Sequence, residues 1–218
     1  MANAYLTIDD APSSDLPDKI VVLDKYDVPA MFFCEGRRLV EHPDFAQQAI
    51  EAGYHLGNHS YSHSRTSELS VEAFREEIER TEFLIEDAYD RAGVDRPGRT
   101  FRFPFGERGE DRSASFQRIL QAWEFTPPDP EPFTYSWYED HHSGMVDWFW
   151  TISVEDWNVN STSDLRKNVE RFGDRFDESS SDIVLFHDAG NTSTLFEHFL
   201  ELLLVRGVTF EDPLALLT

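Results

Sequence analysis

Short apolar runs alternate with longer amphipathic segments along most of the chain, and this alternation limits the fold more than any other feature. The apolar runs predict seven strands: Ala4–Ile8, Ala30–Cys34, His55–Gly57, Phe101–Phe103, Trp148–Ser153, Ile183–Phe186 and Val208–Phe210. The segments between them predict helices at Leu16–Tyr26, Pro43–Ala52, Val71–Ala92, Arg112–Trp123, Ser163–Phe176 and Thr194–Val205.

Strands that are separated by helices usually lie parallel and are joined by right-handed crossovers. Seven strands are too few for a regular eight-stranded barrel. The pattern therefore predicts an α/β fold of the TIM-barrel type, as a distorted, incomplete (β/α) barrel of about seven parallel strands. At 218 residues the chain can bury one sizeable core, and we expect a single domain over residues 1–218.

The charge of the chain is strongly negative. Its 19 basic and 42 acidic residues give a net charge of −23, and the only lysines are Lys19, Lys25 and Lys167. A phosphate backbone or an anionic membrane would be repelled, so we expect neither nucleic acid nor membrane as a partner. Acid-rich, lysine-poor surfaces are typical of proteins that work in high salt, with an ordinary acidic protein as the alternative.

Nothing in the sequence predicts export or membrane insertion. No stretch is apolar enough to span a bilayer. The first residues carry no basic region, and Asp9 and Asp10 would interrupt the apolar core of a signal peptide. We therefore expect a cytoplasmic location.

Residue types that bind metals follow two of the predicted strands. Asp9 and Asp10 end the first strand, and His59 and His63 follow the third. Neighbouring side chains at a strand end can serve different tasks, so one aspartate can bind a metal while the other handles a proton. Histidines four residues apart on a helical turn share a face. Together these residues predict a metal site of two histidines and one carboxylate, and metal-assisted hydrolysis.

Three further polar clusters accompany the later strands. Arg102 lies in the fourth predicted strand, Asp156 and Trp157 follow the fifth, and His187 and Asp188 follow the sixth. In (β/α) barrels the carboxyl ends of the strands carry the active site. Each residue alone has an ordinary interpretation as an ion pair, a cap or a buried histidine. Five clusters at successive strands are poorly explained as surface scatter.

In these clusters the chain closely resembles the polysaccharide deacetylase family, the NodB-homology domain of carbohydrate esterase family 4. The resemblance runs from residue 5 to about residue 205 and includes all five family motifs in order. The motifs are Thr7-Ile8-Asp9-Asp10, His59-Ser60-Tyr61-Ser62-His63, Arg102-Phe103-Pro104-Phe105-Gly106, Asp156-Trp157 and Leu185-Phe186-His187.

The resemblance implies a cofactor and two proton-transfer groups. It implies that Asp10, His59 and His63 bind one divalent metal ion. Imidazole and carboxylate ligands suit Zn²⁺ best here, and also suit Co²⁺, Ni²⁺ or Fe²⁺. The resemblance further implies that Asp9 is the general base and His187 the general acid.

The residues around these groups also receive roles from the resemblance. Arg102 would brace the base, and the backbone amide of Phe105 would help to hold the oxyanion. Asp156 would orient the charged groups, while Trp157 and Leu185 would line the acetyl pocket.

Three positions depart from the family pattern. Ala11 stands where glycine is common, Ser153 replaces the first aspartate of the fourth motif, and Phe105 replaces a frequent tyrosine. All implied metal ligands and both proton-transfer groups are present, so the sequence favours retained activity.

These motifs predict a metal-dependent hydrolase that removes N- or O-acetyl groups from a carbohydrate, so we expect an acetylated carbohydrate as the partner. Two alternatives stay open: an allantoinase-like hydrolase of a small cyclic amide on the same fold, and a non-catalytic carbohydrate-binding protein. The oligomeric state cannot be read from the sequence.

The segment Phe125–Asp147 departs from the alternation of strands and helices. It is rich in proline, aromatic and acidic residues, and prolines at that density exclude a helix or a central strand. Long loops in compact domains are usually functional or mobile. We interpret the segment as an excursion over the catalytic face that shapes substrate access. Its aromatic residues would either stack on a sugar ring or pack under the loop.

Other polar residues near the motifs are expected to be ordinary surface groups. His141 and His142 lie in the acidic segment and are interpreted as solvated residues rather than as a second metal site. Glu155 and Asp188 flank motif residues and are interpreted as exposed carboxylates.

We predict that the free energy of unfolding rises with KCl concentration if the acidic surface is an adaptation to salt, because cations screen the repulsion between carboxylates. Denaturant unfolding followed from low to molar KCl measures this. Full stability without added salt would favour the ordinary acidic protein.

Overall fold

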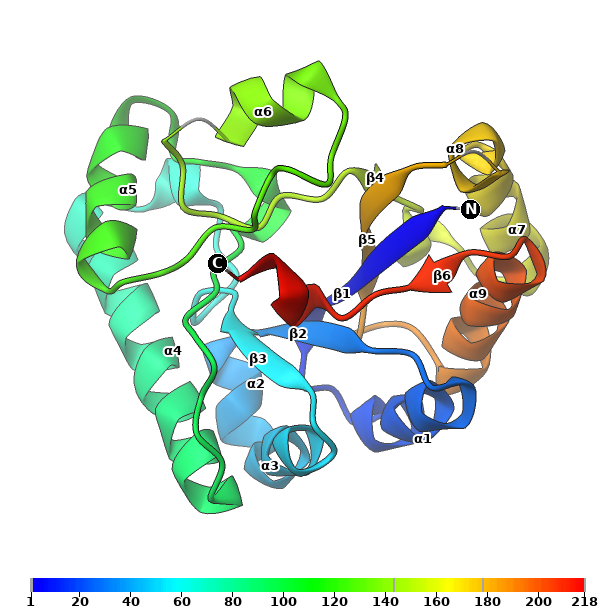
Figure 1. Cartoon of the computed structure of the whole chain (residues 1–218). Coiled ribbons are helices and arrows are strands. Elements are labelled where there is room, and N and C mark those ends of the chain that lie inside the picture. Colours follow the sequence, from blue (N-terminus) through cyan, green and yellow to red (C-terminus); the bar gives the residue numbers. More distant parts are fainter. Residues whose placement is uncertain (1, 143, 178, 218) are drawn as a thin grey trace.

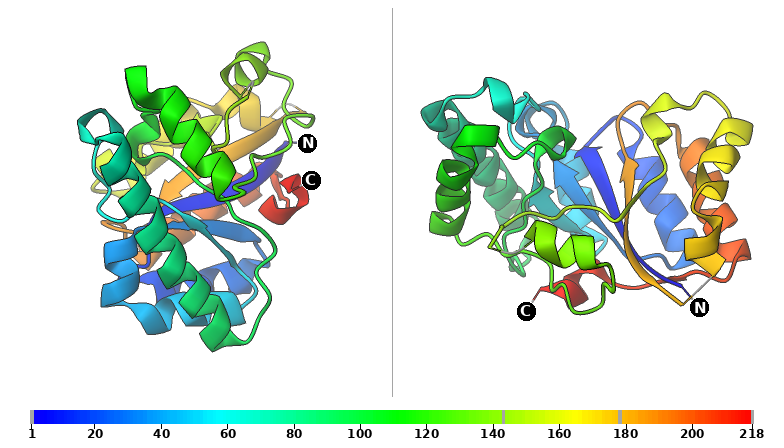
Figure 2. Two further views of the ribbon diagram at one scale, coloured as in Figure 1. Left: turned by 90° about the vertical axis from the view of Figure 1, so that its left-hand side faces the viewer. Right: turned by 90° about the horizontal axis from the view of Figure 1, so that it is seen from above.

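The computed structural model describes residues 2–142, 144–177 and 179–217. In this part of the chain six strands form a parallel sheet, and helices lie around it (Figures 1 and 2). The strand order is β3-β2-β1-β5-β4, and β6 pairs with the beginning of β1. The strands are β1 (Asn3–Ala11), β2 (Ala30–Cys34), β3 (His55–Asn58), β4 (Ile152–Ser153), β5 (Ser181–His187) and β6 (Thr209–Phe210).

The predicted strand Phe101–Phe103 is reduced to a bridge. Phe101 forms one parallel bridge with Asn58 at the end of β3. The ladder cannot continue, because Pro104 has no amide hydrogen to donate and Phe105 turns the backbone with a φ of 58°. The sequence prediction of a strand here is therefore wrong, although the segment does lie beside β3.

A second irregular stretch completes the ring between Phe101 and β4. The Trp148 amide donates to the Phe101 carbonyl over 2.8 Å, and the Thr151 amide donates to the Ile183 carbonyl of β5 over 2.9 Å. Of the predicted strand Trp148–Ser153, only the last two residues pair as a strand. The predicted α/β fold, a distorted (β/α) barrel with mostly parallel strands, is confirmed.

The helices mostly match the predicted segments. They are α1 (Leu16–Tyr26), α2 (Gly36–Glu41), α3 (Pro43–Glu51), α4 (Val71–Ala92), α5 (Ser113–Ala122), α6 (Ser136–His142), α7 (Thr162–Glu170), α8 (Gly173–Asp177) and α9 (Ser193–Val205). Helix α4 begins and ends as predicted, since the Ser70 hydroxyl accepts from the Ala73 amide and Gly93 ends the helix at a φ of 66°. The short helix α2 was not predicted, and the predicted Ser163–Phe176 helix is divided into α7 and α8. Within the described ranges, no helix combines the length and apolar character that crossing a membrane requires.

The sheet separates two apolar cores. Leu6 and Ile8 of β1 pack outward against residues of the surrounding helices. Tyr5 points to the opposite face, where it joins Met31 and Phe33 of β2 in the interior of the barrel. Because both faces of these strands are buried, their sequences are nearly continuous apolar runs.

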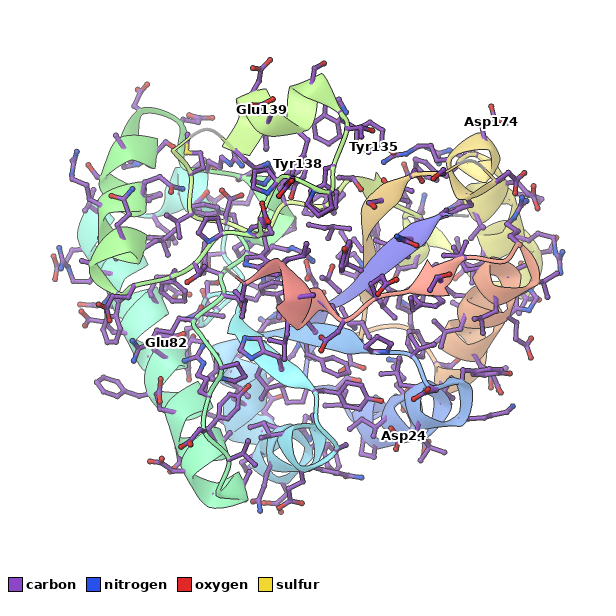
Figure 3. All side chains as sticks on the ribbon, viewed as in Figure 1. Asp24, Glu82, Tyr135, Tyr138, Glu139 and Asp174 are labelled. Atoms are coloured by element: carbon purple, nitrogen blue, oxygen red, sulfur yellow. The ribbon has the colours of Figure 1, made fainter. Side chains whose placement is uncertain are left out.

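The described residues of the segment Phe125–Asp147, which exclude Ser143, pack into the amino-terminal side of the barrel instead of covering the catalytic face. Phe133 and Tyr138 are buried in the interior core, and the Phe133 ring lies edge-on to Tyr5 with 5.9 Å between ring centroids. Figure 3 shows Tyr138 pointing from α6 toward the barrel and Glu139 pointing away from it. Our interpretation as a cover over the catalytic face is wrong, because Phe133 and Tyr138 fill the core. Helix α6 was also missed; it begins only after the last proline of the segment.

We predict that Phe133→Ala lowers the free energy of unfolding by about 3 kcal/mol, because it leaves a cavity in the interior core. Trp137→Ala is the matched control in the same segment, since Trp137 is 43% exposed and should change stability little. Urea unfolding of both variants measures the difference, and equal effects would contradict the buried role of Phe133.

Candidate active site

A β-bulge at the end of β1 brings two carboxylates into one cavity. Between Ile8 and Ala11, β1 advances by three residues while β2 advances by two. Side chains of adjacent strand residues normally point to opposite faces, but a bulge re-aims them. Asp10 takes the strained positive φ of 60°, and both Asp9 and Asp10 line the cavity. The positive φ therefore falls at Asp10 rather than at Ala11, the position where glycine is common.

His59 and His63 lie on an irregular loop after β3, so the predicted helical turn is wrong. Ser60 and His63 both have positive φ values, of 64° and 56°, which a helix cannot contain. Side chains hold this loop: the Ser60 amide donates to Asn58 Oδ1 over 2.8 Å, and the Ser62 amide donates to the carboxylate of Glu77 on α4 over 2.7 Å. The loop still brings the two imidazole rings close together, with 5.0 Å between their centroids.

Asp10, His59 and His63 are the group among the described residues that could hold a metal ion. Asp10 Oδ1 is buried without a hydrogen-bond partner, 3.6 Å from His59 Nε2 and 3.3 Å from His63 Nε2. His59 Nδ1 lies 2.9 Å from the Arg102 carbonyl oxygen, a contact that assigns its proton to Nδ1 and leaves Nε2 free to ligate. Burial lowers the pKa of His63 to about 4, so its ring is neutral as a ligand must be. This donor set fits a divalent cation.

Asp9 is held as a carboxylate by Arg102. Burial alone would raise the pKa of Asp9, but the Arg102 guanidinium and the nearby His59 and His187 rings hold it below its ordinary value. Arg102 Nη1 donates to Asp9 Oδ1 over 2.7 Å, and both side chains are almost fully buried. Asp10 behaves oppositely: burial raises its pKa, and the neighbouring Asp9 carboxylate adds to the rise.

His187 is held as an imidazolium by Asp156. Burial alone would lower its pKa, yet the hydrogen bond from His187 to Asp156 and the negative charge of Asp156 raise the pKa of His187 to about 9. Asp156 Oδ1 lies 2.9 Å from His187 Nδ1, while Oδ2 accepts from the His187 amide and from Asn191 Nδ2. Nδ1 is thus engaged, and Nε2 is the nitrogen left to face the cavity. The Trp157 ring lies edge-on to His187 at 5.0 Å.

These groups meet around one cavity of about 500 Å³. Its lining residues are Asp9, Asp10, His59, His63, Arg65, Phe105, Trp150, Trp157, Leu185 and His187. Two predicted site residues, Arg102 and Asp156, lie directly behind this lining and contact Asp9 and His187. Phe105 and Trp157 are 50% and 57% exposed at the cavity, and the Arg65 guanidinium lies over the Phe105 ring, 4.4 Å from its centroid.

Sequence reasoning missed three residues at this site. Arg65 and Trp150 line the cavity, and Asn191 Nδ2 donates a hydrogen bond of 2.6 Å to Asp156 Oδ2. Trp150 lies in a predicted strand and Arg65 only two residues past His63, but no motif distinguishes either residue. Only the tertiary structure brings them to the cavity.

Two expected surface residues are buried. Asp188 is fully buried and bonds Lys19 over 2.6 Å, which contradicts its interpretation as an exposed carboxylate. His142 is also buried, because its ring stacks on Tyr138 with 3.9 Å between centroids. Glu155 is only partly exposed, with 39% of its side chain accessible, and it pairs with Arg171.

A sequence model of the family described as polysaccharide deacetylase matches residues 2–126, more than half of the chain. The chain belongs to the polysaccharide deacetylase family. An uncharacterised 30.6 kDa protein of Geobacillus stearothermophilus is 24% identical over 212 residues, which are 95% of this chain and 68% of that relative. A chitooligosaccharide deacetylase of Rhizobium leguminosarum biovar trifolii is 33% identical over 93 residues, 42% of this chain. The matched part is 43% of that relative's length.

A solved structure of a related protein has the same fold as this polysaccharide deacetylase family member. A family 4 carbohydrate esterase pseudoenzyme of Bacillus anthracis superposes with a TM-score of 0.73 at 25% identity. The match covers 99% of this chain and 65% of that structure. The barrel of this chain is therefore shared with proteins of family 4, including one described as a pseudoenzyme.

We predict that the stabilisation of the folded state by the Asp156–His187 pair is lost as pH rises from about 6.5 to 9. The pKa of His187 is about 9 in the folded chain and ~6.5 in an unfolded one. The stabilisation is therefore complete below pH ~6.5 and is lost as pH rises through about 9. Asp156→Asn should flatten this dependence.

Urea unfolding of the wild type and Asp156→Asn across this window, with a chelator present, measures the effect. Glu155→Gln is the matched control. Glu155 precedes Asp156 in the sequence and pairs with Arg171 rather than with His187, so this variant should keep the wild-type dependence of unfolding free energy on pH. If the unfolding free energy of Asp156→Asn varied with pH as it does in the wild type, the Asp156–His187 pair would not be the source of this dependence.

Proposed function

We propose that this chain is a metal-dependent hydrolase that removes acetyl groups, N- or O-linked, from a carbohydrate. The observation that carries the proposal is the opposite sorting of two proton-transfer groups on neighbouring strands. Asp9 of β1 is held ionised and His187 of β5 protonated, and both line the cavity that contains the candidate metal ligands. Residues whose environments drive their pKa values apart are the usual acid and base of a hydrolase. Membership of the polysaccharide deacetylase family supports the carbohydrate substrate.

Asp10, His59 and His63 would hold the cation. A Zn²⁺ ion bound there, or Co²⁺, Ni²⁺ or Fe²⁺, would lower the pKa of water toward ~7 and polarise the acetyl carbonyl. Asp9 would accept the proton of the attacking water, because Arg102 keeps its carboxylate ionised and fixed in orientation.

The remaining residues would serve the leaving group and the acyl group. His187 would donate a proton from Nε2 to the leaving nitrogen or oxygen, while Asp156 holds the ring through Nδ1. The Phe105 amide would donate to the developing oxyanion, a contact worth about 3–4 kcal/mol in the transition state. Leu185 and Trp157 would contact the acetyl methyl group, since both line the cavity.

We predict that Asp9→Asn keeps the metal and loses turnover by roughly 100-fold or more, because the base is removed while the candidate ligands remain. Acetate release from N- and O-acetylated oligosaccharides, together with elemental analysis, measures both effects. Glu155→Gln, at a partly exposed carboxylate outside the cavity, is the control for the loss of charge. A fully active Asp9→Asn variant would rule out the base.

We also predict that a chelator abolishes acetate release by the wild type and that added Zn²⁺ or Co²⁺ restores it. His63→Ala should weaken cation binding, measured by calorimetry with the metal alone, because one of three ligands is lost. Hydrolysis of cyclic ureides without acetate release would contradict the proposed substrate. Absence of metal binding by the wild type would favour a non-catalytic carbohydrate-binding protein.

A further inference from the structure

One buried ion pair lies directly behind the active site and takes no part in the chemistry proposed above. Lys19 on α1 and Asp188 after β5 are both fully inaccessible to solvent, with Lys19 Nζ 2.6 Å from Asp188 Oδ1. Lys19 also donates to the Asp188 carbonyl oxygen. The other lysine of α1, Lys25, pairs with Glu197 at the same 2.6 Å, but its side chain is 57% exposed.

The pair connects the two loops that follow β1 and β5, the strands that carry the proton-transfer groups. Asp188 follows His187 directly, and its amide donates to the Asp9 carbonyl oxygen over 2.8 Å. Its carboxylate also accepts from the Ser13 amide, which lies in the loop between Asp10 and α1. Lys19 therefore belongs to the segment that leaves β1, and Asp188 to the segment that leaves β5.

The energetics of such a pair favour a geometric role. Moving two charges out of water costs several kcal/mol for each ion, and apolar residues of similar volume often stabilise a fold equally well. What an apolar pair cannot supply is directed bonding. Here the Asp188 carboxylate accepts from the Ser13 amide and the Lys19 ammonium, which fixes the backbone orientation of both loops.

We propose that Lys19 and Asp188 are positioning residues that lock the loop after β5 to the loop after β1, and so hold His187, at the end of β5, opposite Asp9, near the end of β1. The inference rests on the proposed hydrolase function for its kinetic consequence. The lock, meaning the Lys19–Asp188–Ser13 contacts that join the two loops, can be tested without measuring enzyme activity. Misplacing a reacting group by about 1 Å can cost roughly 100-fold in rate.

The first experiment measures hydrogen exchange of the Ser13 and Asp188 amides in Lys19→Met and Lys25→Met. The lock predicts faster exchange at both amides in Lys19→Met only, because the Asp188 carboxylate loses the ammonium that orients it. Lys25→Met is matched in residue type, helix and pair distance. Equal exchange in the two variants would overturn the lock.

The second experiment measures acetate release by the same metal-loaded variants. We expect kcat of Lys19→Met to fall roughly 10- to 100-fold with KM within about twofold, and Lys25→Met to match the wild type. The double variant Lys19→Met with Asp188→Asn separates positioning from stability, since it leaves no unpaired buried charge. Positioning predicts that the double variant regains unfolding free energy but not kcat. A wild-type kcat in folded Lys19→Met, or recovery of kcat in the double variant, would overturn the positioning role.

The two proposals fail in different ways. A wild-type protein that releases no acetate contradicts the proposed hydrolase, and the exchange experiment then decides the lock by itself. An active wild type with unaffected Lys19→Met kinetics contradicts the positioning role alone.

Discussion

The candidate site depends on the pairing of β1 with β5. The two strands run in register from Asn3 opposite Ser181 to Asp9 opposite His187, which sets the proposed base and acid side by side at one edge of the sheet. On the other side of β1, the bulge against β2 turns Asp10 into the same cavity. Since a shift of one residue would reverse the faces of these side chains, the site depends on this register.

The two proton-transfer groups at the cavity keep their charges because each has a buried partner of opposite charge, and not because solvent stabilises them. Each proton-transfer group has one buried partner of opposite charge, Arg102 for Asp9 and Asp156 for His187. These partners outweigh burial, which by itself would neutralise both groups. Asp10 has no such partner, and its unpartnered oxygen between two imidazole nitrogens is the position where a cation would relieve the burial of charge.

The same barrel serves two needs at its two ends. At the amino-terminal side, Phe133 and Tyr138 insert from the proline-rich segment and complete the interior core. At the carboxyl ends of the strands, three residues that line the cavity, Asp10, His63 and Phe105, take strained conformations with positive φ. Such strain persists only where the surrounding structure fixes it, and the packed interior supplies that support.

The sequence by itself determined the α/β class, most of the buried strands, the extent of helix α4, and the residue types of the candidate site. Apolar periodicity and metal-binding residue types are local properties that can be read along the chain. Only the tertiary structure decided the bulge at Asp10, the irregular loop of His59 and His63, and the burial of Asp188 with Lys19, a residue 169 positions away. The proline-rich segment gave the wrong expectation because its aromatic residues read equally well as a surface or a core. These features depend on contacts between distant segments, whose energies no local pattern contains.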